Sequence, residues 1–219
     1  MNVQGFDSTA ARQALVDCQV RVNDVTNKRI IRAFRHVPRE AFVPKSTSPA
    51  VAYSETEVET APGRWLWRAR DSAKLLQAVE PAEGQSTLVI GAGLGYTAAL
   101  FSDLGMKVTV LEADDDRANA ARAALSAAGF ASVETTAGDL KAGIPGRTFD
   151  VIYVDGAAAA PEKAWLDQLS GKGRLGLIVR DRAAGHARLY RKGAAGYSTL
   201  FEAAPPMLPE LEPAPAFTF

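Results

Sequence analysis

The chain has 219 residues, with 25 Lys and Arg against 25 Asp and Glu, so its formal net charge is zero. This length suits one domain with a substantial core, with or without a short extension, and the neutral balance gives no support for a nucleic-acid partner. A single cysteine excludes an internal disulfide framework, and with only two distant histidines the chain has no zinc-ligand cluster, so no metal is predicted.

The N-terminus lacks the basic and apolar blocks of a signal peptide, and no apolar run approaches the ~18 residues of a membrane span. We therefore expect a cytoplasmic protein with no membrane partner.

Two helices are predicted before residue 37. Apolar residues recur at helical spacing over residues 8–23, at Ala11, Leu15, Cys18 and Val22. This pattern predicts that Cys18 is a small buried core residue. A second helix is predicted over residues 27–36, with Ile30, Ile31 and Phe34 on one side.

The string VPREAFVP at residues 37–44 ends the second helix, because proline biases the residue before it out of the helical region. Together with LVDCQVR at 15–21, Val25-Thr26 and Ala52-Tyr53, this string resembles the N-terminal helical cap of protein-L-isoaspartate O-methyltransferases. The similarity covers most of residues 10–180.

The resemblance implies an α/β, Rossmann-like class I methyltransferase fold. Such a fold has a mostly parallel seven-stranded sheet, helices on both faces and an N-terminal helical cap. Residues 1–71 would form the cap and a substrate-covering segment, residues 72–202 the S-adenosylmethionine-binding core, and residues 203–219 a proline-rich C-terminal tail. The implied activity is methylation of isoaspartyl carboxylates in damaged proteins, so the implied partner is a peptide or protein bearing isoaspartate.

Residues 54–71 depart from this family, whose members carry a G-x-T-I-S-Q-P segment with a serine over the reacting centre. Here Arg64-Trp65-Leu66-Trp67 stands at that place, with no serine or threonine. One interpretation is a replacement substrate mouth, in which Arg64 pairs with a substrate carboxylate while Trp65 and Trp67 exclude water. The alternative is that both tryptophans lie on a short edge strand and cover the core.

A buried strand over residues 87–90 leads into three alternating glycines, Gly91, Gly93 and Gly95, and then into a helix over residues 96–104. The third glycine comes one residue earlier than in the dinucleotide fingerprint G-x-G-x-x-G. This spacing disfavours a nicotinamide dehydrogenase and suits a ligand without phosphates. It resembles the S-adenosylmethionine loop of class I methyltransferases; the alternative is a βα turn without a ligand.

The next strand, residues 107–111, ends on Glu112, at the edge where such sheets bind ligands. A carboxylate there can accept both ribose hydroxyls. Further along, residues 132–136 read as a strand leading to Asp139, which the resemblance places at the adenine amino group, although aspartate is also favoured in turns. The predicted cofactor-binding residues are Gly91, Ala92, Gly93, Gly95, Tyr96, Glu112, Ala113, Asp139, Leu140 and Asp155.

Asp155 ends a fourth buried strand, at residues 149–154. The family's loop usually carries a glutamate two residues before the first glycine, where this chain has Val89, and Asp155 is our candidate substitute for it. Asp155 is also our candidate catalytic residue, although a carboxylate acceptor is already nucleophilic and needs no general base.

The remaining segments complete the sheet. Residues 162–169 predict a helix, residues 171–179 a fifth strand, and residues 187–191 and 197–201 an antiparallel pair. Two other functions stay open because the serine segment and the loop glutamate are missing. The first is a cofactor-binding or partner-binding homologue that has lost the reaction, and the second is a methyltransferase with a different acceptor.

Overall fold

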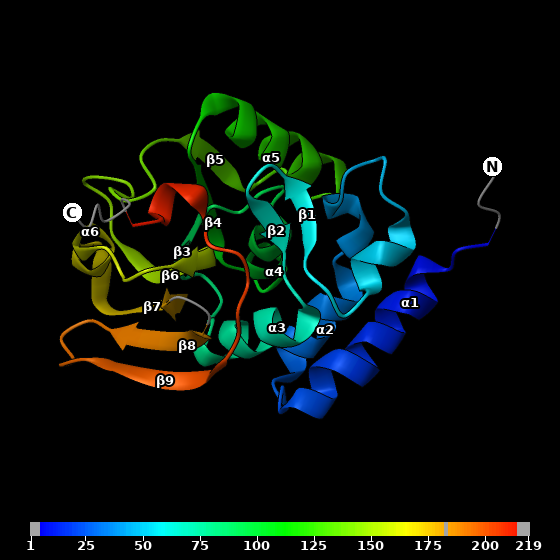
Figure 1. Ribbon diagram of the computed structural model, residues 1–219, viewed down its shortest axis with the longest axis horizontal. Helices are drawn as coiled ribbons and strands as arrows, with labels where there is room; N and C mark the ends of the chain where they lie inside the picture. The colour runs from blue at the N-terminus through cyan, green and yellow to red at the C-terminus, as the bar shows by residue number, and fades with distance from the viewer. Residues whose placement is uncertain (1–4, 182–183, 214–219) are drawn as a thin grey trace, which may run out of the picture.

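The computed structural model describes residues 5–181 and 184–213. Among them, a seven-stranded sheet has the order β5-β4-β3-β6-β7-β8-β9, and β1 and β2 form a separate hairpin (Figure 1). The strands are β1 Val58–Ala61, β2 Arg64–Leu66, β3 Ser86–Ile90, β4 Lys107–Glu112, β5 Glu134–Ala137, β6 Phe149–Ala158, β7 Leu169–Asp181, β8 Ala184–Arg191 and β9 Tyr197–Glu202. Strands β3 to β7 pair in parallel, while β8 and β9 pair antiparallel. The mostly parallel sheet predicted from the sequence is confirmed.

The α-helices are α1 Ser8–Leu15, α2 Lys28–His36, α3 Ala69–Ala78, α4 Tyr96–Asp103, α5 Asp115–Ala127 and α6 Lys163–Asp167. Shorter turns are the π-helix η1 Val16–Val20 and the 3₁₀ segments η2 Arg21–Asn23, η3 Arg39–Phe42, η4 Pro49–Tyr53 and η5 Pro209–Leu211. Within the described ranges, none of these helices combines the length and apolar character needed to cross a membrane.

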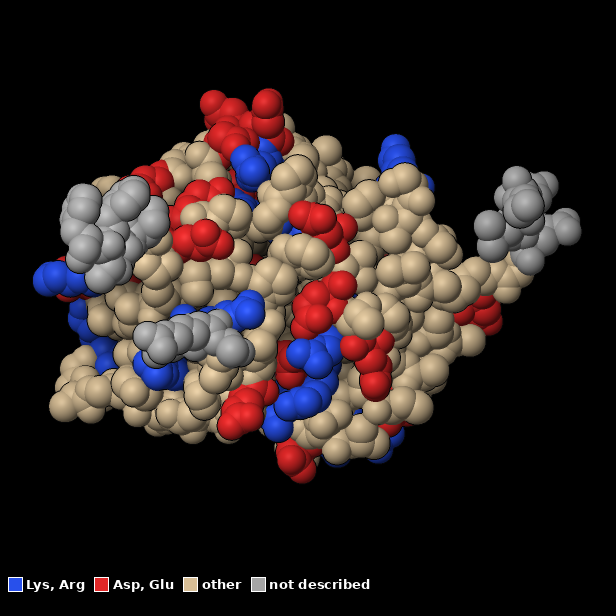
Figure 2. Space-filling model, in the orientation of Figure 1, with Lys and Arg blue, Asp and Glu red and all other residues tan. Residues whose placement is uncertain are grey.

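The two faces of the sheet bury separate cores, because successive side chains of a strand point to opposite faces. In β3, Val89 belongs to the core that also holds residues of α3, α4, α5 and the N-terminal cap. Leu88 and Ile90 belong to the other core, which includes Trp165 of α6 and two residues of the C-terminal tail, Leu208 and Leu211. On the face drawn in Figure 2, basic and acidic side chains lie intermingled.

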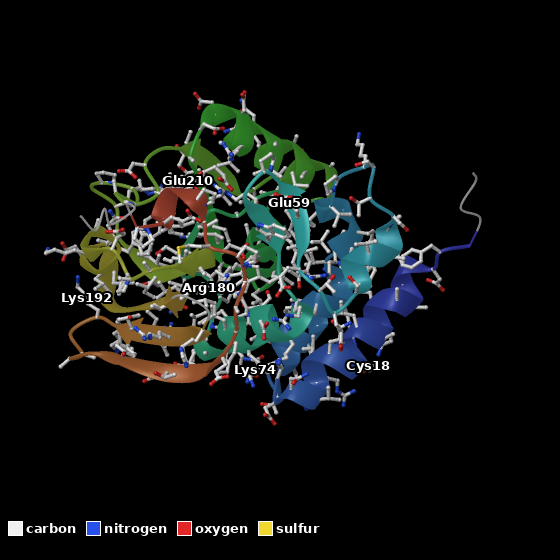
Figure 3. The ribbon with its side chains drawn as sticks, viewed as in Figure 1. Cys18, Glu59, Lys74, Arg180, Lys192 and Glu210 are labelled. Carbon is white, nitrogen blue, oxygen red and sulfur yellow. The ribbon has the colours of Figure 1, made fainter. Side chains whose placement is uncertain are left out.

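The first helix differs from its predicted register. It continues from α1 into the π-helical turn η1, and the residues buried here are Leu15, Val16, Gln19 and Val20. The expectation that Cys18 is buried is wrong, because Cys18 is exposed and Val22 is 66% exposed. A π-turn contains one more residue than an α-turn, so the buried face after it moves by one position. Figure 3 shows Cys18 on the outer side of this helix.

The VPREAFVP string ties the cap to the hairpin region and to α4 through Arg39, which is 1% exposed. Its guanidinium donates to the carbonyl oxygens of Ala52 and Trp67. It also lies 4.8 Å from the centre of the Tyr96 ring, at the start of α4. The cap is therefore fixed to the hairpin region and to the helix that follows the glycine loop.

The C-terminal tail packs on the sheet over residues 203–211, a segment that we call the strap. Its backbone is hydrogen-bonded to the end of β6: Ala157 N donates to Pro206 O at 3.1 Å, and Leu208 N donates to Ala157 O at 3.0 Å. In Figure 1 it is the red trace that leaves β9 and passes β2 on its way to η5. Residues 214–219 of the predicted tail lie outside the described residues.

Candidate functional site at the carboxyl edge of the sheet

The glycine loop forms the tight turn between β3 and α4 that the spacing predicts. Gly91, Gly93 and Gly95 have φ values of 71°, 59° and 97°, a region that residues with a Cβ rarely adopt. The Gly93 N–H donates to Glu112 Oε1 at 2.7 Å. The loop and the end of β4 are therefore joined directly.

Glu112, the last residue of β4, is fully buried. Arg64 Nε donates to its Oε2 at 3.0 Å, and Arg64 Nη2 lies 2.9 Å from the same oxygen. Because Gly93 N–H occupies Oε1, both carboxylate oxygens already have protein partners. The Arg64 guanidinium stands where the sequence predicts ribose hydroxyls.

Arg64 also pairs with Glu210 of η5. Arg64 Nη2 donates to Glu210 Oε1 at 3.0 Å, and Nη1 donates to Oε2 at 3.1 Å. Burial lowers the pKa of Arg64, but its hydrogen bonds with Glu210 and Glu112 outweigh burial and raise that pKa overall. Burial likewise raises the pKa of Glu210, and the hydrogen bond with Arg64 reverses this effect, so that its pKa is lowered. The two carboxylates that bind Arg64, those of Glu112 and Glu210, thus both belong to this chain.

The strap covers the glycine loop next to this pair. A Cβ built on Gly91 would lie 2.6 Å from Leu208 Cδ1, and one on Gly156 would lie 2.4 Å from Leu208 Cγ. One on Gly63, in the β1–β2 turn, would lie 2.6 Å from Pro209 Cγ. Leu208 is 1% exposed. The lack of a Cβ at these glycines therefore lets the strap pack closely on their backbone.

A cavity of about 10 Å³ lies between the hairpin and the glycine loop, lined among others by Thr60, Trp65, Trp67, Tyr96 and Asp155. This volume corresponds to about one water-sized sphere. Burial raises the pKa of Asp155 to about 7, and the charge of Glu112 adds to this effect against a hydrogen bond from Thr97. Asp155 is therefore a buried carboxyl group that titrates near neutrality.

The aromatic residues of the predicted site have different surroundings. Trp67 is 2% exposed and packs on Tyr153, with ring centres 6.0 Å apart, so it covers the core. Its Nε1 has no hydrogen-bond partner among the described residues, and its ring lines the cavity. Trp65 is half-buried at the cavity wall. Tyr96 packs edge-on against Phe34 and Phe42 of the cap.

The loop after β5 lies beside Glu112, because Gly138 N donates to Glu112 O at 2.8 Å. Asp139 is exposed, and its Oδ1 accepts from Lys141 N at 2.9 Å, as in a turn. Leu140 is buried, and its carbonyl accepts from Trp165 Nε1 at 2.8 Å. Ala113 is half-buried, with its N–H 3.4 Å from Glu112 Oε2. These residues therefore lie at the carboxyl edge of the sheet, where the ends of parallel strands are predicted to meet.

Sequence reasoning missed Leu208 and Glu210, because a proline-rich segment has no periodicity that predicts where it packs. Figure 3 shows Glu210 on η5, close to the sheet that carries the other site residues. The residue types predicted for S-adenosylmethionine are therefore present at this edge. In the arrangement described here Arg64 occupies the Glu112 carboxylate and Leu208 lies against Gly91, so both predicted contact points for an adenosyl group already have partners in the chain.

The model of the family "Protein-L-isoaspartate(D-aspartate) O-methyltransferase (PCMT)" matches residues 10–203. A protein-L-isoaspartate O-methyltransferase of Methanoculleus marisnigri is 33% identical over 165 residues, which are 75% of this chain and 74% of the relative. The corresponding protein of Methylorubrum populi is 34% identical over 171 residues, 78% and 80% of the two chains.

Solved structures show the same fold. A protein-L-isoaspartate O-methyltransferase superposes with a TM-score of 0.77 at 22% identity, covering 90% of this chain and 65% of that one. A putative one from Plasmodium falciparum, in complex with S-adenosyl-L-homocysteine, gives 0.76 at 14% identity, covering 94% and 100%. The match over the cap, the glycine loop and the sheet establishes that this chain belongs to the protein-L-isoaspartate(D-aspartate) O-methyltransferase family.

Proposed function

We propose that this protein is an S-adenosylmethionine-dependent O-methyltransferase that methylates isoaspartyl carboxylates in peptides or proteins. The observation that carries the proposal is the family match over residues 10–203, which includes both the cap and the loop where Gly93 contacts Glu112.

A methyl-acceptor assay tests this function. An isoaspartyl peptide and the same peptide with ordinary aspartate are incubated with the protein and the cofactor, and the base-labile methyl ester is measured as released methanol. We expect ester only with the isoaspartyl peptide. Gly93→Ala, whose Cβ would lie 2.9 Å from Thr60 Oγ1, should lower the yield, with a thermal melt to confirm that this variant folds.

A second candidate function is a homologue that binds the cofactor or a partner but has lost the reaction. It is favoured by Arg64, which stands where the family has its serine segment and which is bound by Glu112 and Glu210. Calorimetry together with the assay separates the two candidates, because binding without any ester supports the second. Cofactor consumption with a cell extract but not with the peptide indicates a different acceptor.

A further inference from the structure

The strap is held at this edge by contacts of two kinds. At its middle, backbone hydrogen bonds to Ala157 extend the end of β6. Toward its end it is held by the side chain of Leu208, just before η5, in the core that contains Leu88 and Ile90, and by the ion pair from Glu210 of η5 to Arg64. Glu210 is 29% exposed, whereas Arg64 and Glu112 are fully buried. The Glu210 pair is thus the part of this arrangement that water reaches first.

The same segment also contacts the Arg64–Glu112 pair. Ion pairs exposed to water are weak, whereas this one is fully buried, and Glu210 of η5 is hydrogen-bonded to its guanidinium. When η5 leaves, water reaches the guanidinium, and ribose hydroxyls can then compete for the Glu112 carboxylate. One movement would therefore both uncover Gly91 and weaken the contact that occupies the carboxylate.

We propose that the strap, residues 203–211, is an autoinhibitory segment that closes the cofactor site, and that a nucleoside-bearing ligand binds only after Glu210 and Leu208 leave Arg64 and Gly91. The identity of this ligand as S-adenosylmethionine or its demethylated product rests on the function proposed above. A closed state of this kind lowers the apparent affinity by the fraction of molecules that are open.

The first test is calorimetric titration of S-adenosyl-L-homocysteine into the full-length wild type, Glu210→Ala and Glu212→Ala. Glu212 is the matched control, since it lies two residues further on, is exposed, and makes no side-chain hydrogen bond or ion pair among the described residues. Glu210→Ala removes a charge-assisted contact from the closed state. This variant should therefore bind S-adenosyl-L-homocysteine about tenfold more tightly than the wild type, or tighter still. Glu212→Ala should stay within about twofold of the wild type.

The second test needs no variant. The Leu208 amide is hydrogen-bonded to Ala157 O in the closed arrangement, so hydrogen exchange at Leu208 reports the strap directly. Saturating S-adenosyl-L-homocysteine should speed its exchange at least about tenfold in the wild type, while amides in the middle of β3 stay protected.

Three results would overturn the proposal: equal affinity in all three proteins, no binding by Glu210→Ala, or bound ligand with the Leu208 amide still protected. These outcomes are separable from those of the methylation assay. If Glu210→Ala binds the ligand tightly but forms no ester on the isoaspartyl peptide, the proposed function fails and the strap proposal stands. If the wild type forms ester while the Leu208 amide stays protected from exchange, the proposed function stands and the strap proposal fails.

Discussion

Arg64 and Glu112, 48 residues apart in the sequence, form an ion pair in which neither side chain is exposed. The Nε–Oε2 distance is 3.0 Å, and Gly93 N–H completes the environment of the carboxylate. A buried pair of this kind is costly to break, because the remaining partner is left as an unpaired charge in the interior.

Arg64→Ala should therefore lower the free energy of unfolding by about 3–5 kcal/mol, measured by urea denaturation. The control is Arg21→Ala, which removes an exposed pair with Asp17 and should cost no more than about 1 kcal/mol. Replacing both Arg64 and Glu112 by Met should cost less than Arg64→Ala alone. A double variant that is less stable than the single one would contradict this account.

Asp155 should make stability depend on pH. In the folded state the pKa of Asp155 is raised from 3.8 to about 7, chiefly by burial. Folding therefore favours the protonated form of Asp155. The stabilising contribution is complete below about pH 4 and is lost as the pH rises through about 7. Asp155→Asn should thus gain stability relative to the wild type, by up to about 4 kcal/mol near pH 8, and gain little near pH 4. Urea titrations across this range measure it, and a difference independent of pH would be inconsistent with a titrating Asp155.

The contact between Gly91 and Leu208 predicts energetic coupling. Gly91→Ala places a Cβ at a φ of 71° and 2.6 Å from Leu208 Cδ1, so it should cost about 1–3 kcal/mol from backbone strain, with the clash in addition. Leu208→Ala creates space there and should cost about 2–5 kcal/mol by itself. In a double-mutant cycle, we expect the double variant to be more stable than the sum of the single costs by about 1 kcal/mol or more. Simple additivity would mean that the strap does not touch the loop.

The π-turn η1 predicts which side chains of the first helix matter. Cys18 is exposed, so it should react with a thiol reagent in the native protein about as fast as in urea, and Cys18→Ser should change stability by no more than about 0.5 kcal/mol. Gln19 is buried and donates to Tyr53 O at 3.0 Å. Gln19→Ala should therefore cost about 1–3 kcal/mol. A protected thiol at position 18 would favour an uninterrupted α-helical register.

Much of the core could be predicted from the sequence, because strand and helix periodicities are local signals. The apolar run before Gly91 and the glycines at positive φ are examples, since a tight βα turn leaves few other choices. The short strand ending on Glu112 is also predicted by the sequence, and it pairs in parallel with β3. The sequence does not predict the π-turn, because the residue types of η1 do not distinguish its hydrogen bonds from those of an α-helix.

The state of the site depends on long-range contacts, which a single sequence does not reveal. The sequence suggests Arg64 as a partner for a substrate carboxylate, and that remains a prediction. In the structure its guanidinium contacts Glu112 and Glu210, 48 and 146 residues away. Nothing in the composition of residues 203–211 indicates that Leu208 packs on Gly91.

The position of the strap in the sequence also bears on the synthesis of the protein. Every strand of the sheet is translated before residues 203–211, and contacts between distant residues close late in folding. A nascent chain therefore carries the glycine loop and β4 before the strap that contacts them has been made. If the strap closes the site as proposed, a ligand that needs this edge uncovered meets no strap until translation is complete.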